Sequence, residues 1–223
     1  MFKLSILAFG LSLISAFVAA QPAVQYEVTI TNITPGQTFT PQLVVTHPQD
    51  MQLFNLGEPA SEELERLAEG GDTAPLMDAV ANFAMDVQTI PGLLEPGQSS
   101  STTVIGHPQK GYISVAAMMI PTNDAFIGLN RVPLPRNGTA TFMVPAYDAG
   151  TELNDQSCQN MPGPACGISD AGYSPEPGEG YVHIGNGFHD LGDVDEDGFD
   201  ILGPQTYDWR NSVARITVTR IRN

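Results

Sequence analysis

Short runs in which hydrophobic and polar residues alternate recur along the chain and predict β-strands. In residues 24–33, Tyr26, Val28 and Ile30 fall on one side of an extended chain, and mostly polar residues fall on the other. Residues 212–221 alternate in the same way. Both segments are therefore expected to be strands with one buried face and one solvent-exposed face.

The middle of the chain carries apolar runs that predict more deeply buried strands. Tyr112–Ile120 is apolar almost throughout, as is typical of a central strand, and residues 99–105 change from polar to apolar. Residues 139–145 form a further run, preceded by an Asn-Gly pair that is typical of hairpin turns. A proline inside residues 38–46 predicts that this run is an edge strand.

One region between the strands has helical character. Ser61 can cap a helix over residues 62–68, and two glycines end it. A second short helix is expected over residues 73–83, with Leu76, Val80 and Phe83 on one side. Many short strands with Gly/Pro turns, together with these helices, predict a mainly β fold: an antiparallel β-sandwich with a short helical insertion.

The first residues have the composition of a secretory signal peptide. Lys3 gives a positive start, residues 4–18 are apolar, and small residues at 18–20 form a cleavage site. A membrane anchor is the alternative, but the apolar run is short for a bilayer and no other stretch is long enough to span one. We expect a signal peptide over residues 1–20, one sandwich domain over residues 21–223, and a secreted or periplasmic location.

The charge balance is strongly acidic. The chain has 25 acidic and 9 basic residues, a formal net charge of −16. Such a surface repels nucleic acid and anionic membranes, so neither is expected as a partner. It suits cation binding or a saline medium, and the charge alone does not choose between them. We expect a monomer whose partner is an extracellular protein or glycan.

Two cysteines, Cys158 and Cys166, lie close together in the sequence. In an oxidising compartment such a pair predicts a local disulfide that shapes the loop between them. A metal site with two thiolates is the alternative, but the chain offers no further cysteine ligands.

Three acidic residues lie where apolar runs end. Asp124 follows the run Tyr112–Ile120, while Asp148 and Glu152 follow residues 139–145. If the two runs are neighbouring strands, their loops can direct these carboxylates toward one point. Clustered carboxylates repel one another unless a cation lies between them, and hard oxygen ligands suit calcium. The alternative is a set of ordinary solvated loop acids.

Three sequence motifs, two of which contain these acids, can be compared with known families. They are Met-Met-Ile-Pro-Thr-Asn-Asp-Ala-Phe-Ile-Gly at residues 118–128, Tyr-Asp-Ala-Gly-Thr-Glu at 147–152, and the segment from Asp to Arg at 208–220 that contains the Trp. Together they resemble the spondin N-terminal domain family over residues 26–221. The resemblance implies an extracellular antiparallel β-sandwich with one bound calcium that serves adhesion and ligand binding and is not an enzyme.

The resemblance also implies a ligand set. The calcium ligands of the family fall on Asp124, Asp148 and Glu152 of this chain. The family usually has aspartate at the last position, so Glu152 changes the reach and keeps the charge. Ala125 and Tyr147 stand where the family usually has tryptophans.

Two other segments contain possible metal ligands. The segment Asp193-Val-Asp-Glu-Asp-Gly198 has the spacing of the first half of an EF-hand loop, but Pro204 stands where that loop needs its bidentate glutamate. Solvated acids are the simpler interpretation of this loop. His183 and His189 flank a glycine-rich turn, and a zinc site would need a third ligand beside them.

Three functional hypotheses follow from the sequence. The first is a secreted calcium-binding domain for adhesion or ligand recognition at the cell surface or in extracellular matrix. The second is a secreted hydrolase that uses the acidic loops, although no nucleophile motif is complete. The third is a structural component of the envelope or matrix whose calcium only stabilises the fold.

Overall fold

The computed structural model describes residues 22–166, 174–188, 192–210 and 212–222. The signal peptide expected over residues 1–20 lies outside these ranges. The described strands are β1 (Val24–Asn32), β2 (Thr38–Phe39), β3 (Gln42–His47), β4 (Asp86–Ile90), β5 (Ser99–Gly106), β6 (Tyr112–Ile120), β7 (Ala125–Pro133), β8 (Thr139–Asp148), β9 (His183–Ile184) and β10 (Ser212–Arg220). The helices are α1 (Glu62–Gly70), α2 (Ala74–Val80) and α3 (Pro204–Tyr207), with a 3₁₀ turn η1 (Pro164–Cys166).

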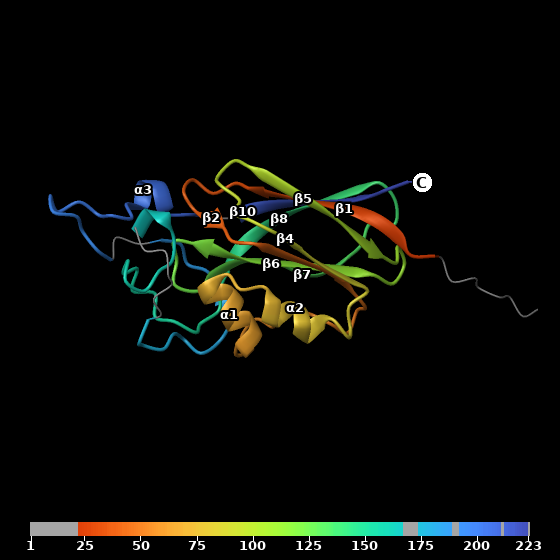
Figure 1. Ribbon diagram of the computed structural model, residues 1–223, viewed down its shortest axis with the longest axis horizontal. Helices are drawn as coiled ribbons and strands as arrows, with labels where there is room; N and C mark the ends of the chain where they lie inside the picture. The colour runs from red at the N-terminus through yellow and green to blue at the C-terminus, as the bar shows by residue number, and fades with distance from the viewer. Residues whose placement is uncertain (1–21, 167–173, 189–191, 211, 223) are drawn as a thin grey trace, which may run out of the picture.

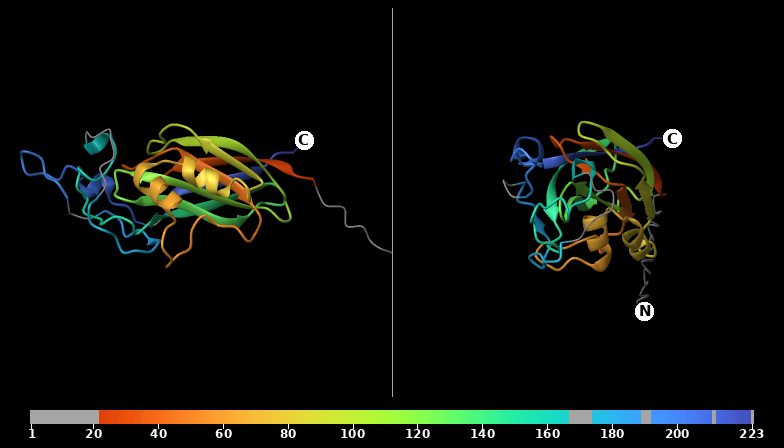
Figure 2. Two further views of the ribbon diagram at one scale, coloured as in Figure 1. Left: turned by 60° about the horizontal axis from the view of Figure 1, so that its bottom comes forward. Right: turned by 60° about the vertical axis from the view of Figure 1, so that its left-hand side comes forward.

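The described strands pair antiparallel in the order β4-β3-β6-β7-β8-β10-β1-β5, with β2 beside β6 and β9 beside β8. The end strands β4 and β5 also lie against each other, and the Ile105 N–H donates to Asp86 Oδ2 at 2.8 Å. The sheet therefore folds round into a nearly closed sandwich, as the right-hand view of Figure 2 shows. This architecture confirms the predicted fold class.

Alternation in β1 and β10 gives one face to the core and one to solvent. The register pairs Ile30 with Ile216 and Val28 with Val218, and all four side chains are fully buried. The intervening Thr29 side chain is half-buried and bonds a serine hydroxyl of β5 on the outer face. Period-two patterning therefore located these strands correctly, because only one of their faces is covered.

Strands β3, β6 and β7 are covered on both faces. Val115 of β6 belongs to the core between the sheets, whereas the next residue, Ala116, belongs to a second cluster with Leu64 of α1. Helices α1 and α2 lie along this outer face (Figure 1). The near-continuous apolar run of β6 follows from this double burial.

The helices begin and end close to the predicted residues. The Ser61 hydroxyl accepts from the Leu64 N–H at 3.2 Å, which caps α1. Gly71 ends it with a φ of 68°, and a Cβ there would lie 2.7 Å from the Thr40 side chain, so this position needs glycine. Helix α2 ends earlier than predicted, at Val80. Leu76 and Val80 are buried, whereas Phe83 lies beyond the helix and is 68% exposed, so it does not share their side.

Two strand predictions need correction. The proline of residues 38–46 lies between β2 and β3, so β3 is an interior strand between β4 and β6. The apolar runs that precede Asp124 and Asp148 are not neighbours, because β7 lies between β6 and β8. Within β7, Arg131 has a positive φ of 52° and the pairing with β6 shifts register, which breaks the periodicity that would reveal a strand.

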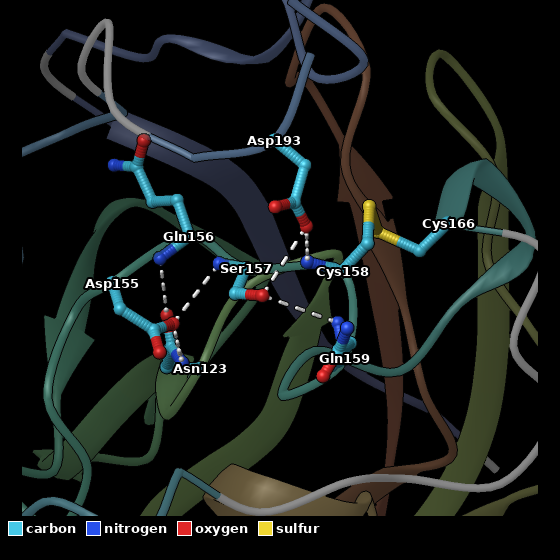
Figure 3. Close-up of a disulfide and its surroundings, with 8 residues drawn as sticks. All are labelled: Asn123, Asp155, Gln156, Ser157, Cys158, Gln159, Cys166 and Asp193. Carbon is cyan, nitrogen blue, oxygen red and sulfur yellow. Dashed lines mark hydrogen bonds between the residues drawn. A yellow bond between two sulfur atoms is a disulfide. The ribbon is translucent and has the colours of Figure 1, made fainter. Parts of the chain in front are cut away.

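Long loops gather at the end of the sandwich away from the C-terminus (Figure 1). The predicted disulfide Cys158–Cys166 is confirmed and lies in this loop layer (Figure 3). Beside it, Asp193 Oδ2 accepts from the Cys158 N–H at 2.8 Å and from the Ser157 hydroxyl at 3.2 Å. The start of the acidic loop is therefore fastened to the disulfide loop, while Asp195 accepts hydrogen bonds from N–H groups of its own loop.

Within the described ranges, no helix has both the length and the apolar composition needed to cross a membrane.

Candidate metal centre and ligand pocket

The pairing of β7 with β8 brings Asp124 and Asp148 together. Ala125 at the start of β7 pairs with Asp148 at the end of β8, and the Ala149 N–H donates to the Asp124 carbonyl at 3.3 Å. Asp124 is fully buried and Asp148 is 4% exposed. The two carboxylates predicted from the sequence thus lie side by side in a region that water scarcely reaches.

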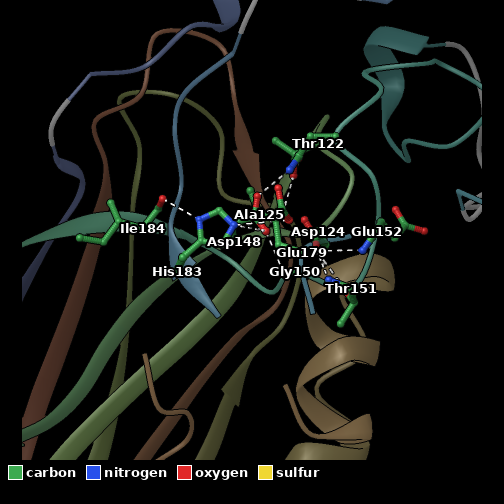
Figure 4. Close-up of polar contacts among 11 residues, drawn as sticks. Thr122, Asp124, Ala125, Asp148, Gly150, Thr151, Glu152, Glu179, His183 and Ile184 are labelled. Carbon is green, nitrogen blue, oxygen red and sulfur yellow. Dashed lines mark hydrogen bonds and ion pairs between the residues drawn. The ribbon is translucent and has the colours of Figure 1, made fainter. Parts of the chain in front are cut away.

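Asp124 has one satisfied and one unsatisfied oxygen. Its Oδ2 accepts from the Thr151 N–H at 2.7 Å, the Thr151 hydroxyl at 3.1 Å and the Glu152 N–H at 3.1 Å (Figure 4). Its Oδ1 is buried without a hydrogen-bond partner among the described residues. Burial, followed by the charge of Asp148, raises the pKa of Asp124 to about 7. A buried carboxylate oxygen without a partner is costly in free energy unless the group binds a proton or a cation lies beside it.

Asp148 belongs to a group that could hold a metal ion. One ligand atom each from Asp148, Glu179 and His183 lies within 4.8 Å of the others. The His183 Nε2 is 3.3 Å from Asp148 Oδ1 and 3.5 Å from Glu179 Oε2. Asp148 also accepts from the Gly150 N–H and the Asn154 side-chain amide, both at 2.8 Å. Burial raises the pKa of Asp148, so its ionised form depends on nearby positive charge.

His183 is oriented by the backbone. Its Nδ1 lies 3.0 Å from the Ile184 carbonyl, which can only accept, so Nδ1 carries a proton and Nε2 faces the two carboxylates. Burial lowers the pKa of His183, but the Ile184 bond and the Asp148 and Glu179 charges outweigh it and the net pKa is raised. This arrangement suits either an ion pair or an imidazole ligand whose other nitrogen is held in place.

Glu152 lies next to Asp124 but outside the Asp148 group. Its N–H bonds Asp124, whereas its carboxylate points away from His183 and accepts from the Ser174 N–H at 2.8 Å (Figure 4). Its other oxygen, Oε2, is buried without a partner among the described residues. Burial, with the charges of Glu69 and Asp124, raises the pKa of Glu152 to about 8.

Sequence reasoning missed Glu179 and assigned His183 only to a possible pair with His189, which lies outside the described residues. Both enter the site because the chain returns across β8: the Gly180 N–H donates to the Gly150 carbonyl at 2.8 Å, and β9 pairs with β8. Gly150 has a φ of 68°, and a Cβ there would lie 2.3 Å from the Tyr181 carbonyl oxygen. The glycine-rich composition of these loops was the available signal, but it does not specify which segments meet.

A pocket of about 190 Å³ opens beside Asp148. Its walls come from the turn before β7, the loop after β8, the segments before and after β9, and the residues before β10. Its polar and apolar lining residues include Asn123, Asn154, Glu179, Asn186, Phe188 and Trp209. The pocket and the carboxylate group therefore share Asp148 and Glu179 and form one continuous site.

Comparison with known proteins identifies the domain. The family model described as Spondin_N matches residues 26–161, which is more than half of the chain and includes Asp124, Asp148 and Glu152. Comparison with curated proteins gave no match. The antiparallel sandwich, the paired acidic loops and this match agree, and the chain belongs to the spondin N-terminal domain family.

Proposed function

We propose that this chain is a secreted recognition domain that binds one calcium ion through Asp124 and Asp148 at the loop end of the sandwich. Spondin N-terminal domains are extracellular and of a binding type, and the Cys158–Cys166 disulfide fits an oxidising compartment. The observation that carries the proposal is Asp124 Oδ1, buried without a partner beside a second buried carboxylate.

The charges around the site favour a cation. Among the described residues, neither lysine nor arginine forms an ion pair with Asp124, Asp148 or Glu152, and His183 contacts only Asp148 of these three. Carboxylates that are close together and buried are costly to ionise without compensation. A divalent cation would supply that compensation, and carboxylate oxygens are hard donors of the kind that calcium takes.

The proposed ligand set combines sequence and structure. Asp124, Asp148 and Glu152 are the residues implied by the family, and each has a buried carboxylate. Glu179 is a further oxygen donor, placed near Asp148 by the returning loop. When bound, calcium would supply the positive charge that keeps these side chains ionised. It would also hold the loop after β8 against the segment that leads into β9.

One observation favours a second candidate metal. The imidazole of His183 lies in the Asp148–Glu179 group, and imidazole nitrogen suits zinc much better than calcium. The two metals make different demands on this residue. A zinc site would need His183, whereas a calcium site built from oxygens would not.

Thermal unfolding of the mature chain with calcium, zinc or chelator tests the proposal. Binding to the folded state stabilises it by RT ln(1 + [L]/Kd), so calcium should raise the melting temperature and excess chelator should lower it. We expect Asp148→Asn to remove this response and the matched variant Asp195→Asn, in the exposed acidic loop, to keep it.

His183→Gln separates the two metals. It should retain most of the calcium response, whereas a response to zinc alone that His183→Gln abolishes would favour the second candidate. The calcium proposal fails if Asp148→Asn melts with the same calcium dependence as the parent.

A further inference from the structure

We propose that the pocket beside Asp148 binds a neutral sugar ring at the end of a glycan chain. This inference rests on the proposed recognition function and gives it a ligand class. A pocket of about 190 Å³ is smaller than the roughly 300–1,000 Å³ that holds drug-sized ligands. It therefore suits one small ring better than a folded peptide segment.

The polar lining of the pocket matches hydroxyl groups. Side-chain carboxamides come from Asn123, Asn154, Gln156 and Asn186, and carboxylates come from Asp148 and Glu179. A carboxamide offers both donors and an acceptor, and a sugar hydroxyl needs both kinds of partner. The lining contains neither lysine nor arginine, so no cationic side chain of the pocket would pair with an anionic ligand such as a phosphate.

Several of these amides are held in fixed orientations. Asn123 is almost fully buried; its amide donates to Asp155 Oδ1 at 3.1 Å, and its oxygen accepts from the Gln156 N–H at 3.2 Å (Figure 3). The Asn154 amide donates to Asp148 Oδ2 at 2.8 Å. Polar groups that are already oriented lose little entropy when a ligand binds, which favours affinity from a small contact area. Asn186, on the rim, is exposed and has no bonded partner in the described part of the chain.

One wall of the pocket is aromatic. Phe188 and Trp209 are 2% and 8% exposed, and their ring centroids lie 6.4 Å apart at an angle of 56°. The C–H face of a sugar ring is apolar and packs against such a wall, while its hydroxyls point to the amides. The Trp209 indole N–H is buried without a partner in the described ranges, and groups of this kind are usually satisfied by water or a ligand oxygen.

The pocket continues into a shallower groove. Gly185, Asn186 and Trp209 line both hollows, and the groove extends past Ile184 and Arg210. A terminal sugar in the pocket would therefore leave room for the next ring of the chain along the groove. We expect disaccharides to bind more tightly than the corresponding single sugar.

The fluorescence of Trp209 gives a direct test, because it is the only tryptophan in the chain. The mature protein in millimolar calcium is titrated with neutral disaccharides: mannobiose, cellobiose, galactobiose and N,N′-diacetylchitobiose. We expect at least one to change the fluorescence saturably. Asn186→Ala should weaken that binding about tenfold, the usual effect of losing one good hydrogen bond. The matched variant Asn137→Ala, in the β7–β8 hairpin, should bind like the parent.

The outcomes separate this inference from the calcium proposal when the calcium-dependent melting shift is measured on the same samples. A calcium shift without a response to any disaccharide overturns the sugar site and leaves the calcium site standing. A fluorescence response to sugar without a calcium-dependent melting shift supports the sugar site and overturns the calcium proposal. A fluorescence response to a disaccharide that Asn186→Ala leaves unchanged also overturns the sugar site.

Discussion

Replacing Asp124 by asparagine should stabilise the metal-free protein and abolish its response to calcium. Burial and the charge of Asp148 raise the pKa of Asp124 from 3.8 to about 7. This difference corresponds to roughly 4 kcal/mol of unfavourable free energy for the ionised carboxylate in the folded state. Asparagine has nearly the same shape, and its amide oxygen can still accept the bonds from Thr151 and Glu152.

The sign of the effect depends on pH. A carboxyl group whose pKa is raised on folding contributes stability at low pH, and that contribution is lost as the pH rises through the folded value of about 7. The loss begins at the unfolded value of 3.8. Without metal, Asp124→Asn should therefore gain about 2–4 kcal/mol of unfolding free energy near pH 8, about 1–2 kcal/mol near pH 5, and little below the unfolded value.

Urea unfolding at the two pH values, with chelator or with calcium, measures these differences. Calcium should stabilise the parent by roughly 2.7 kcal/mol at a hundredfold excess over Kd and leave Asp124→Asn almost unchanged. Asp195→Asn serves as the control, since Asp195 is exposed. An Asp124→Asn variant that is less stable than the parent in chelator and still responds fully to calcium would refute the reasoning.

Three further predictions concern the core, a buried histidine and the loop that returns to the site. Ile216→Asp places an unpaired charge in the fully buried core and should cost at least about 4 kcal/mol, leaving little folded protein by circular dichroism; a cooperative transition close to that of the parent would contradict this placement. Burial lowers the pKa of His47, whose ring nitrogens bond Pro48 and Ser114, so the free energy of unfolding should fall as the pH drops below about 6.5. His47→Gln should flatten this pH dependence, measured as the urea midpoint at several pH values. If the midpoints of the parent and of the variant depend equally on pH, His47 is not its source. Gly150→Ala should cost about 1–3 kcal/mol in thermal unfolding and weaken calcium binding, since a Cβ there meets the Tyr181 carbonyl; an unchanged melting curve would show that the returning loop is not packed as described.

Features that depend on nearby residues could be predicted from the sequence. The alternation in β1 and β10 shows which residues enter the core, and Ser61 and Gly71 set the ends of α1. The spacing of the cysteines was enough to predict their disulfide. In each case the controlling interaction lies within a few residues along the chain, so local periodicity and local chemistry are sufficient.

Part of the site could also be predicted. Asp124 and Asp148 were identified as a pair from their places beside apolar runs, and the structure brings them together. The reason differs from the expected one: their strands are separated by β7, and Asp124 meets Asp148 because it directly precedes the strand that pairs with β8. The short turn between β6 and β7 therefore places Asp124 beside Asp148.

Only the tertiary structure decided the rest of the site. Glu179 and His183 reach Asp148 because a long loop returns to pair with β8, and Glu152 points its carboxylate toward Ser174 instead of toward His183. The pocket is likewise assembled from five segments spread between Thr122 and Trp209. No local pattern encodes such contacts. They depend on the register of antiparallel strands and on glycines that allow two backbones to approach, and both are set when the whole sandwich closes.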